Sequence, residues 1–211
     1  MGSEMGLRER KRQQTYQSVS DTAVALFLER GFDGVSVAEV AAAAGISKPT
    51  LFRYFPAKED LVLHRFADHE DEAARVVAAG RADGLAALPA LHARFREGLE
   101  RHDPVTGLND NPHVLAYHGL LYGTPSLVAR LYGYQDRSER ALAGELGDGL
   151  GARVAAGQII AVQRILAMEN WRRIAAGESA AAGYAQAVEA ADQAFGQLSE
   201  GLGGQYGETG R

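Results

Sequence analysis

The sequence of 211 residues contains no cysteine, which excludes a disulfide framework and a metal site built on thiolates. It also has no uninterrupted apolar run near the ~20 residues that a membrane-spanning helix requires. The N-terminus is polar and charged, without the apolar stretch of a secretory signal. We therefore expect a soluble cytoplasmic protein without a membrane partner, and we predict neither a bound metal nor a cofactor.

Motifs of catalysis are absent as well. The glycine-rich stretch 147–151 resembles a phosphate-binding loop, but no strand precedes it and its third glycine is misplaced. No G-x-S-x-G nucleophile motif is present. The six histidines form no metal motif: His64 and Asp68 share a helix face, but His69 lies about 100° round from Asp68, and His113 and His118 diverge similarly. These absences predict that the chain is not an enzyme.

Charge is distributed unevenly along the chain. The net charge of −5 argues weakly against a nucleic-acid partner, yet residues 1–65 hold nine Lys/Arg and eight Asp/Glu, for a net charge of +1. A basic arm precedes the first expected helix and contains Arg8, Arg10, Lys11 and Arg12. A solvated tail is the alternative interpretation of this arm. The asymmetry favours an N-terminal part that faces DNA.

Helical periodicity dominates the sequence, so we predict an all-α fold. One example is the apolar stripe Tyr16, Val19, Ala23 and Phe27, which ends at Gly31. We expect an N-terminal three-helix domain over residues 1–56, a larger helical bundle over 57–202 and a flexible tail over 203–211. The expected helices span 15–30, 37–44, 48–55, 57–80, 84–102, 112–123, 125–146, 152–176 and 180–202.

The second and third expected helices are short and joined by a glycine-containing turn. Ser36 and Glu39 have the spacing of a capping box at the start of the second helix. Ser47 caps the third, and Gly45 lies in the turn between them. This pattern is typical of a helix-turn-helix, whose second helix enters the major groove of DNA. Leu51 and Phe55 should face inward, which leaves Lys48, Pro49, Thr50, Phe52 and Arg53 facing outward or sideways.

Residues 19–63 closely resemble the DNA-binding domain of the tetracycline-repressor (TetR) family. The stretches that carry the resemblance are Leu26-Phe27, Gly31-Phe32, Ala44-Gly45-Ile46-Ser47, Thr50-Leu51-Phe52-Arg53-Tyr54-Phe55 and Lys58-Glu59-Asp60-Leu61. The chain departs from the family at Phe52, where a tyrosine is frequent, and at Ala57, where a serine often caps the next helix. The resemblance implies base-edge or nearby backbone contacts from Lys48, Thr50 and Phe52, and phosphate contacts from Ser36, Ser47, Tyr54 and Lys58. Pro49 and Arg53 complete the predicted DNA-binding surface.

The last two expected helices carry the pattern of packed helix pairs. In the final helix, apolar residues recur at alternating four- and three-residue steps, as in a heptad seam. An intramolecular core is one interpretation, whereas the family resemblance implies a four-helix bundle between two subunits. The predicted interface residues are Ile159, Val162, Leu166, Tyr184, Val188, Ala191, Phe195 and Leu198.

The middle of the chain is the candidate binding site for a small-molecule effector. Large apolar and polar-tipped side chains recur there, a composition typical of ligand pockets, although each one can equally belong to a core. The stretch 170–178 resembles one found in family members linked to acyl-CoA-like ligands. The candidate lining residues are Phe66, His69, Phe95, His113, Tyr117, His118, Leu121, Tyr122, Met168, Asn170 and Trp171.

The overall prediction is a homodimeric regulator that binds a palindromic DNA operator. Family resemblance implies a repressor that a lipophilic or acyl-CoA-like effector releases. The alternative is a helical small-molecule-binding or enzymatic protein that does not bind DNA.

Overall fold

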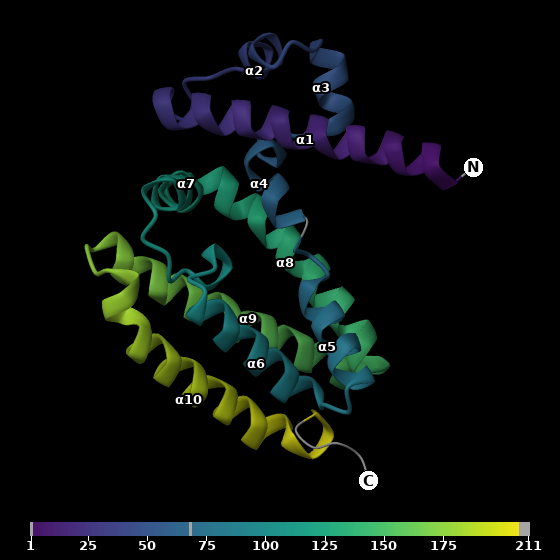
Figure 1. The fold of residues 1–211 in the computed structure, drawn as a ribbon, viewed down its shortest axis with the longest axis vertical. Helices are drawn as coiled ribbons and strands as arrows, with labels where there is room; N and C mark the ends of the chain where they lie inside the picture. The colour runs from purple at the N-terminus through teal and green to yellow at the C-terminus, as the bar shows by residue number, and fades with distance from the viewer. Residues whose placement is uncertain (1, 68, 207–211) are drawn as a thin grey trace. The chain divides into compact units, whose positions relative to one another are not determined.

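A computed structural model describes residues 2–67 and 69–206, with the side chains of residues 10–66 and 69–202. The described residues form ten α-helices and one short 3-10 helix, with no strand among them (Figure 1). The prediction of an all-α fold is therefore confirmed. The chain divides into two compact units, one made of residues 1–68 and 116–132 and the other of 69–115 and 133–211.

The first unit contains the predicted helix-turn-helix. Its core lies between α1 and the three short helices that follow, and Val19, Phe27, Leu51, Phe55 and Leu61 are buried there. The serine hydroxyl of Ser20 on α1 donates to the Leu61 carbonyl of α4 over 2.7 Å. The helices of this unit are α1 (Gly2–Arg30), α2 (Val37–Ala43), α3 (Lys48–Tyr54), α4 (Asp60–Ala67), most of α7 (Pro112–Gly123) and the start of α8 (Pro125–Leu146).

The second unit is a helical bundle. In it α10 lies alongside both α6 and α9, as Figure 1 shows. Leu91 and Leu99 of α6, Ile159 of α9 and Phe195 of α10 form the centre of its hydrophobic core. The elements of this unit are α5 (Glu72–Ala82), α6 (Ala87–Glu100), η1 (Pro104–Thr106), the rest of α8, α9 (Gly149–Ala175) and α10 (Ala180–Tyr206).

Several helix boundaries follow the sequence expectation and others do not. The bounds of α7 and α8 are those expected. The single helix expected over 57–80 is wrong, because the structure has the separate helices α4 and α5 there. The basic arm expected ahead of the first helix is wrong, because its residues form the first part of α1, which begins at Gly2. Its Glu, Arg, Lys and Gln residues are good helix formers, which explains the extension.

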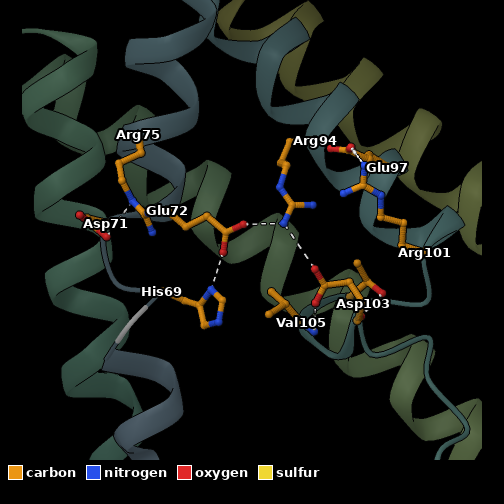
Figure 2. A network of polar contacts seen from close by, with 10 residues as sticks. His69, Asp71, Glu72, Arg75, Arg94, Glu97, Arg101, Asp103 and Val105 are labelled. Carbon is orange, nitrogen blue, oxygen red and sulfur yellow. Dashed lines mark hydrogen bonds and ion pairs between the residues drawn. The ribbon is translucent and has the colours of Figure 1, made fainter. Parts of the chain in front are cut away.

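A chain of polar contacts fixes the start of α5 in the second unit (Figure 2). Glu72 pairs with His69 Nδ1 at 2.7 Å and accepts from Arg94 of α6 at 2.8 Å. The His69 contact and the charge of Arg94 hold the pKa of Glu72 below its usual range. Arg94 also reaches Asp103, whose carboxylate caps η1 by accepting from the Val105 N–H. These contacts join α5, α6 and η1.

The eight predicted interface residues lie in, or pack against, the hydrophobic core of the second unit. This placement agrees with the intramolecular interpretation of the heptad seam, and their part in a dimer stays a prediction. Other apolar side chains of α9 point outward, since Leu150, Val154 and Ile165 are exposed. By length and composition alone α9 is apolar enough to cross a membrane, a test that the core helix of a soluble bundle also passes.

Candidate nucleic-acid interface

The start of α2 has the predicted capping box. The Ser36 hydroxyl accepts from the Glu39 N–H at 3.2 Å, and the Glu39 carboxylate accepts from the Ser36 N–H at 2.8 Å. Arg30 at the end of α1 also donates to Glu39. The Arg30 hydrogen bond, together with those from Ser36, lowers the pKa of Glu39 to about 2. The capping box and its link to α1 therefore stay formed at neutral pH.

The turn into α3 is built by Gly45 and Ser47. Gly45 has φ +68°, a left-handed conformation that glycine adopts without steric cost. The Ser47 hydroxyl accepts from the Thr50 N–H at 3.2 Å and lies 2.8 Å from the Thr50 hydroxyl. The predicted N-cap is confirmed. It places two hydroxyl groups and the Lys48 N–H at the exposed start of α3, where Pro49 has no N–H to offer.

The two faces of α3 differ as predicted. Leu51 and Phe55 are buried in the first unit. On the outer side Lys48, Pro49 and Arg53 are exposed, Thr50 is half-buried, and Phe52 is 41% exposed. The Lys48 ammonium lies 5.9 Å from the centre of the Phe52 ring, so both side chains belong to one surface. This short helix presents a cation, a hydroxyl and an aromatic ring to the outside.

An aromatic cluster packs against the C-terminal end of α3 on its inner side. Tyr16 of α1 packs edge-on against Tyr54 at 4.8 Å and against Phe55 at 5.2 Å, and its ring stacks on His64 of α4. Arg12 lies 5.8 Å from the Tyr16 ring, one turn before it on α1. Sequence reasoning placed Tyr16 on the apolar face of α1 but missed its role as the support of Tyr54.

The exposed side chains of Arg10, Lys11 and Arg12 lie along the first part of α1. The side chain of Arg8, which also belongs to the predicted basic arm, is outside the described residues. Because these cations stand on a helix, their spacing is fixed by the helical rise of about 1.5 Å per residue. The first unit therefore holds a second basic feature besides Lys48 and Arg53 of α3.

The start of α4 is fastened by side chains of the turn that follows α3. Ala57 stands where a capping serine was expected, and its N–H donates instead to the Asp60 carboxylate at 3.0 Å. The Lys58 ammonium donates to the Phe32 carbonyl and lies 4.3 Å from the centre of the Phe32 ring. Lys58 is thus half-buried and points into the turn between α1 and α2.

These contacts indicate that Lys58 stabilises the fold, so its substitution should affect stability more than DNA binding, in contrast to that of Lys48. We expect Lys58→Met to lower the unfolding free energy by about 1 kcal/mol, because one hydrogen bond to the Phe32 carbonyl is lost. The slope of log K against log salt for DNA binding should change by less than the ~0.9 expected for one phosphate contact. Urea unfolding and fluorescence anisotropy at several salt concentrations measure the two quantities.

Lys48→Met is the matched control, because Lys48 is exposed on α3. It should reduce DNA affinity and leave the unfolding free energy unchanged. If Lys58→Met instead reduced the salt slope by about one phosphate and kept the wild-type stability, the phosphate-contact interpretation of Lys58 would stand.

The predicted pocket residues fall into two sets. Five lie in the first unit, where the Phe66 and Tyr117 rings stack at 6.4 Å and the Tyr117 hydroxyl donates to the Val62 carbonyl at 2.7 Å. The members of this set are Phe66, Tyr117, His118, Leu121 and Tyr122. The members in the second unit are His69, Phe95, His113, Met168, Asn170 and Trp171.

Most members of the second set contact other residues of the protein in ways that explain their positions without a ligand. Phe95 packs 6.1 Å from Phe195 in the core, and buried Asn170 donates to the Thr106 carbonyl at 2.9 Å. His69 is exposed and pairs with Glu72, and His113 is exposed at the start of α7. A ligand-binding role for either set stays a prediction.

His118 on α7 is a buried histidine with an expected pH dependence. Burial lowers its pKa from 6.5 to about 4. The unfolded chain therefore takes up a proton as the pH falls below about 6.5, whereas the folded chain resists it until about pH 4. Stability should be complete above pH 6.5 and fall by up to about 3 kcal/mol as the pH drops to 4, at about 1.4 kcal/mol per tenfold change in proton affinity.

We expect His118→Gln to remove much of this acid sensitivity, measured as the difference in Tm between pH 7.5 and pH 5. His113→Gln replaces an exposed histidine of the same helix and should keep the wild-type difference. An unchanged acid sensitivity in His118→Gln would show that other groups cause it.

Comparison with known proteins agrees with the geometry of the first unit. Residues 20–64 match the family described as bacterial regulatory proteins, tetR family. The chain is 32% identical over 136 residues to the HTH-type transcriptional regulator TcmR of Streptomyces glaucescens, which covers 64% of this chain and 58% of TcmR. Matches to two other curated regulators cover 30% and 24% of their lengths, so the chain spans well under two thirds of each relative.

Solved structures show the same fold across both units. NalD of Pseudomonas aeruginosa, the secondary repressor of the MexAB-OprM multidrug efflux pump, superposes with a TM-score of 0.56 at 15% identity, covering 87% of this chain and 97% of that one. FadR of Thermus thermophilus, a transcriptional repressor in complex with lauroyl-CoA, has a TM-score of 0.52 at 20% identity, covering 89% and 94%. At these identities the likeness concerns the fold alone.

Proposed function

We propose that this chain belongs to the tetR family of bacterial regulatory proteins and is a DNA-binding transcriptional repressor that a small molecule releases from its operator. One observation supports this most directly. The buried pair Leu51 and Phe55 fixes a seven-residue helix whose outer side carries Lys48, Thr50 and Phe52. An α-helix is about 10–12 Å across with its side chains, so it fits the major groove of B-DNA, which is about 12 Å wide.

The side chains of this surface have distinct roles in the proposal. Phe52 makes apolar contact with a thymine methyl group, and Thr50 and Lys48 reach base edges or the nearby backbone. Phosphates accept hydrogen bonds from the first N–H groups of α2 and from the Lys48 N–H of α3, beside the caps Ser36 and Ser47. Pro49, Arg53 and Tyr54 border the same surface. Arg10, Lys11 and Arg12 on α1 supply positive charge for phosphates next to the site that α3 reads.

Dimerisation is part of the proposal because one short helix reads too few base pairs to bind tightly. Two copies of α3 about 34–36 Å apart would read two half-sites of a palindrome. The outward apolar residues of α9, with Val154 49% and Ile165 55% exposed, supply surface that a second copy of the chain can cover. The half-buried residues Val162, Leu166, Tyr184 and Val188 border this surface in the proposed dimer.

For the effector we propose a lipophilic molecule such as an acyl-CoA. The support is the shared fold with FadR of Thermus thermophilus, whose structure holds lauroyl-CoA, and the aromatic and histidine side chains of α7. Such a ligand acts by binding one arrangement of the dimer better than the other, and it shifts the equilibrium only by that difference in affinity.

A selection of bound duplexes from random DNA tests the proposal. The selected duplex and a scrambled duplex of equal length are then compared by fluorescence anisotropy, with sedimentation to determine the oligomeric state. We expect a palindromic sequence bound by a dimer at least 10³-fold more tightly than the scrambled duplex. Equal affinity for the two duplexes, or a strictly monomeric particle, would overturn the proposal.

Lauroyl-CoA added to the protein–operator complex tests the effector class. We expect the operator affinity to fall by about 5- to 150-fold at saturating ligand. No change with acyl-CoAs of several chain lengths would reject this class of effector, while the specific DNA binding measured above would still support a repressor.

A further inference from the structure

The carboxylate of Asp60 is buried in the first unit, where it accepts hydrogen bonds from two segments of the chain. Its side chain is 7% exposed, and it accepts from the Ala57 N–H at the start of α4. Arg130 of α8 donates to it through two nitrogens, from Nε to Oδ1 at 2.9 Å and from the terminal nitrogen to Oδ2 at 3.0 Å. This paired geometry fixes the direction as well as the distance between the two groups.

Asp60 is the first residue of α4 and stands at the end of the turn that follows α3. The recognition helix ends at Tyr54, Phe55 is buried at its end, and residues 56–59 lead to Asp60. The same turn contains Lys58, which donates to the Phe32 carbonyl. The position of Asp60 therefore sets where the chain leaves α3.

The segment that holds Asp60 lies about 70 residues away in the sequence but belongs to the same compact unit. Residues 116–132 contribute Arg130 and also Tyr117, whose hydroxyl donates to the Val62 carbonyl. On its other side α4 is held by α1, through Ser20 to the Leu61 carbonyl and Arg65 to Asp21. Helix α4 is thus held on one side by α1 and on the other by the segment 116–132.

We propose that Arg130 is a positioning residue for DNA recognition: it acts through Asp60 on the turn after α3 and so makes operator binding depend on the segment 116–132. This inference rests on the proposed function. The two partners differ in exposure, because the Arg130 side chain is 48% exposed and that of Asp60 only 7%. Loss of Arg130 therefore removes two hydrogen bonds and one positive charge from a buried carboxylate, and the turn before α4 rearranges in response.

The test compares Arg130→Met with Arg137→Met, using the selected operator and a scrambled duplex. Arg137 is on the same helix, is 46% exposed and also pairs with a carboxylate through two nitrogens, that of Glu70 in the second unit. Both variants lose one positive charge and one ion pair. We expect at least a 10-fold loss of operator affinity in Arg130→Met, unchanged affinity for the scrambled duplex, and less than a 2-fold change in Arg137→Met.

Two more variants complete the experiment. Arg130→Lys keeps the charge but not the paired geometry, so it should lose operator affinity as well, even if Arg130→Met folds poorly. Asp60→Asn combined with Arg130→Met should bind the operator no more weakly than Arg130→Met alone, because both substitutions remove one interaction. Each variant is compared by Tm, and affinities refer to the folded fraction.

The outcomes separate the inference from the proposed function. Wild-type affinity for the operator in Arg130→Met and Arg130→Lys would overturn the inference and leave the repressor standing. An equal loss for both duplexes with a smaller salt slope would also overturn it, because Arg130 would then act as a plain phosphate contact. A wild-type protein without preference for any duplex would refute the proposed function itself.

Discussion

Replacing Gly107 with alanine should remove more than about 4 kcal/mol of the unfolding free energy, among the largest losses for a single substitution. Gly107 follows η1 with φ +73°, and a Cβ atom there would lie 1.9 Å from the carbonyl oxygen of Ala167 and 3.0 Å from the backbone nitrogen of Trp171. Both atoms belong to the backbone of α9, which cannot yield as a side chain can. The neighbouring bond from Asn170 to the Thr106 carbonyl holds η1 against α9 and would have to break.

Gly84→Ala separates this clash from backbone strain. Gly84 lies in the same unit with φ +77°, and a Cβ atom there would meet nothing within 4 Å. Its substitution should cost only about 1–2 kcal/mol, the strain of a left-handed residue. Urea unfolding of both variants gives the comparison. Similar losses at the two positions would show that η1 moves away from α9 at little cost.

The parts of the fold that follow from local rules could be predicted from the sequence. Ser36, Glu39 and Ser47 satisfy the backbone groups at helix starts within three residues, so their role needs no knowledge of the rest of the chain. The bounds of α7 and α8 follow in the same way, because prolines stand at their first positions and cannot continue a preceding helix.

Features that depend on distant segments could not be predicted. The break between α4 and α5 carries no glycine or proline, and the structure secures it through Arg94 of α6. The family resemblance implies a phosphate contact for Lys58, but the sequence does not reveal its hydrogen bond to the Phe32 carbonyl, which is 26 residues away. The pairing of Asp60 with Arg130 spans 70 residues and requires residues 116–132 to pack against α4 within the first unit. Neither helical periodicity nor a capping pattern in the sequence predicts a contact between residues so far apart.

The sequence predicts a basic arm ahead of the first helix, which contains Arg8, Arg10, Lys11 and Arg12. The same residues are good helix formers, and they continue α1 instead. This changes what the segment can do, because cations on a helix meet phosphates at fixed positions without the ordering entropy that a flexible arm loses on binding.

The combined substitution Thr50→Ala and Phe52→Ala should lower affinity for the selected operator by at least ~100-fold. Each lost base contact costs about 1–3 kcal/mol, and well-separated contacts add. Affinity for a scrambled duplex should stay nearly constant, because the phosphate contacts and the cations of α1 are intact. The unfolding free energy should change little, since Phe52 is 41% exposed and the core pair Leu51 and Phe55 is untouched.

Val105→Ala is the matched control, because Val105 is an apolar side chain of similar exposure, 48%, in the second unit. It should keep wild-type affinity for both duplexes. A double variant of α3 that still preferred the operator to the scrambled duplex would mean that base recognition lies elsewhere in the chain. A loss of equal size on both duplexes would mean that α3 contributes affinity without sequence recognition. The expected loss on the operator alone requires Thr50 and Phe52 to face base edges, because only contacts of that kind distinguish two duplexes of equal charge and length.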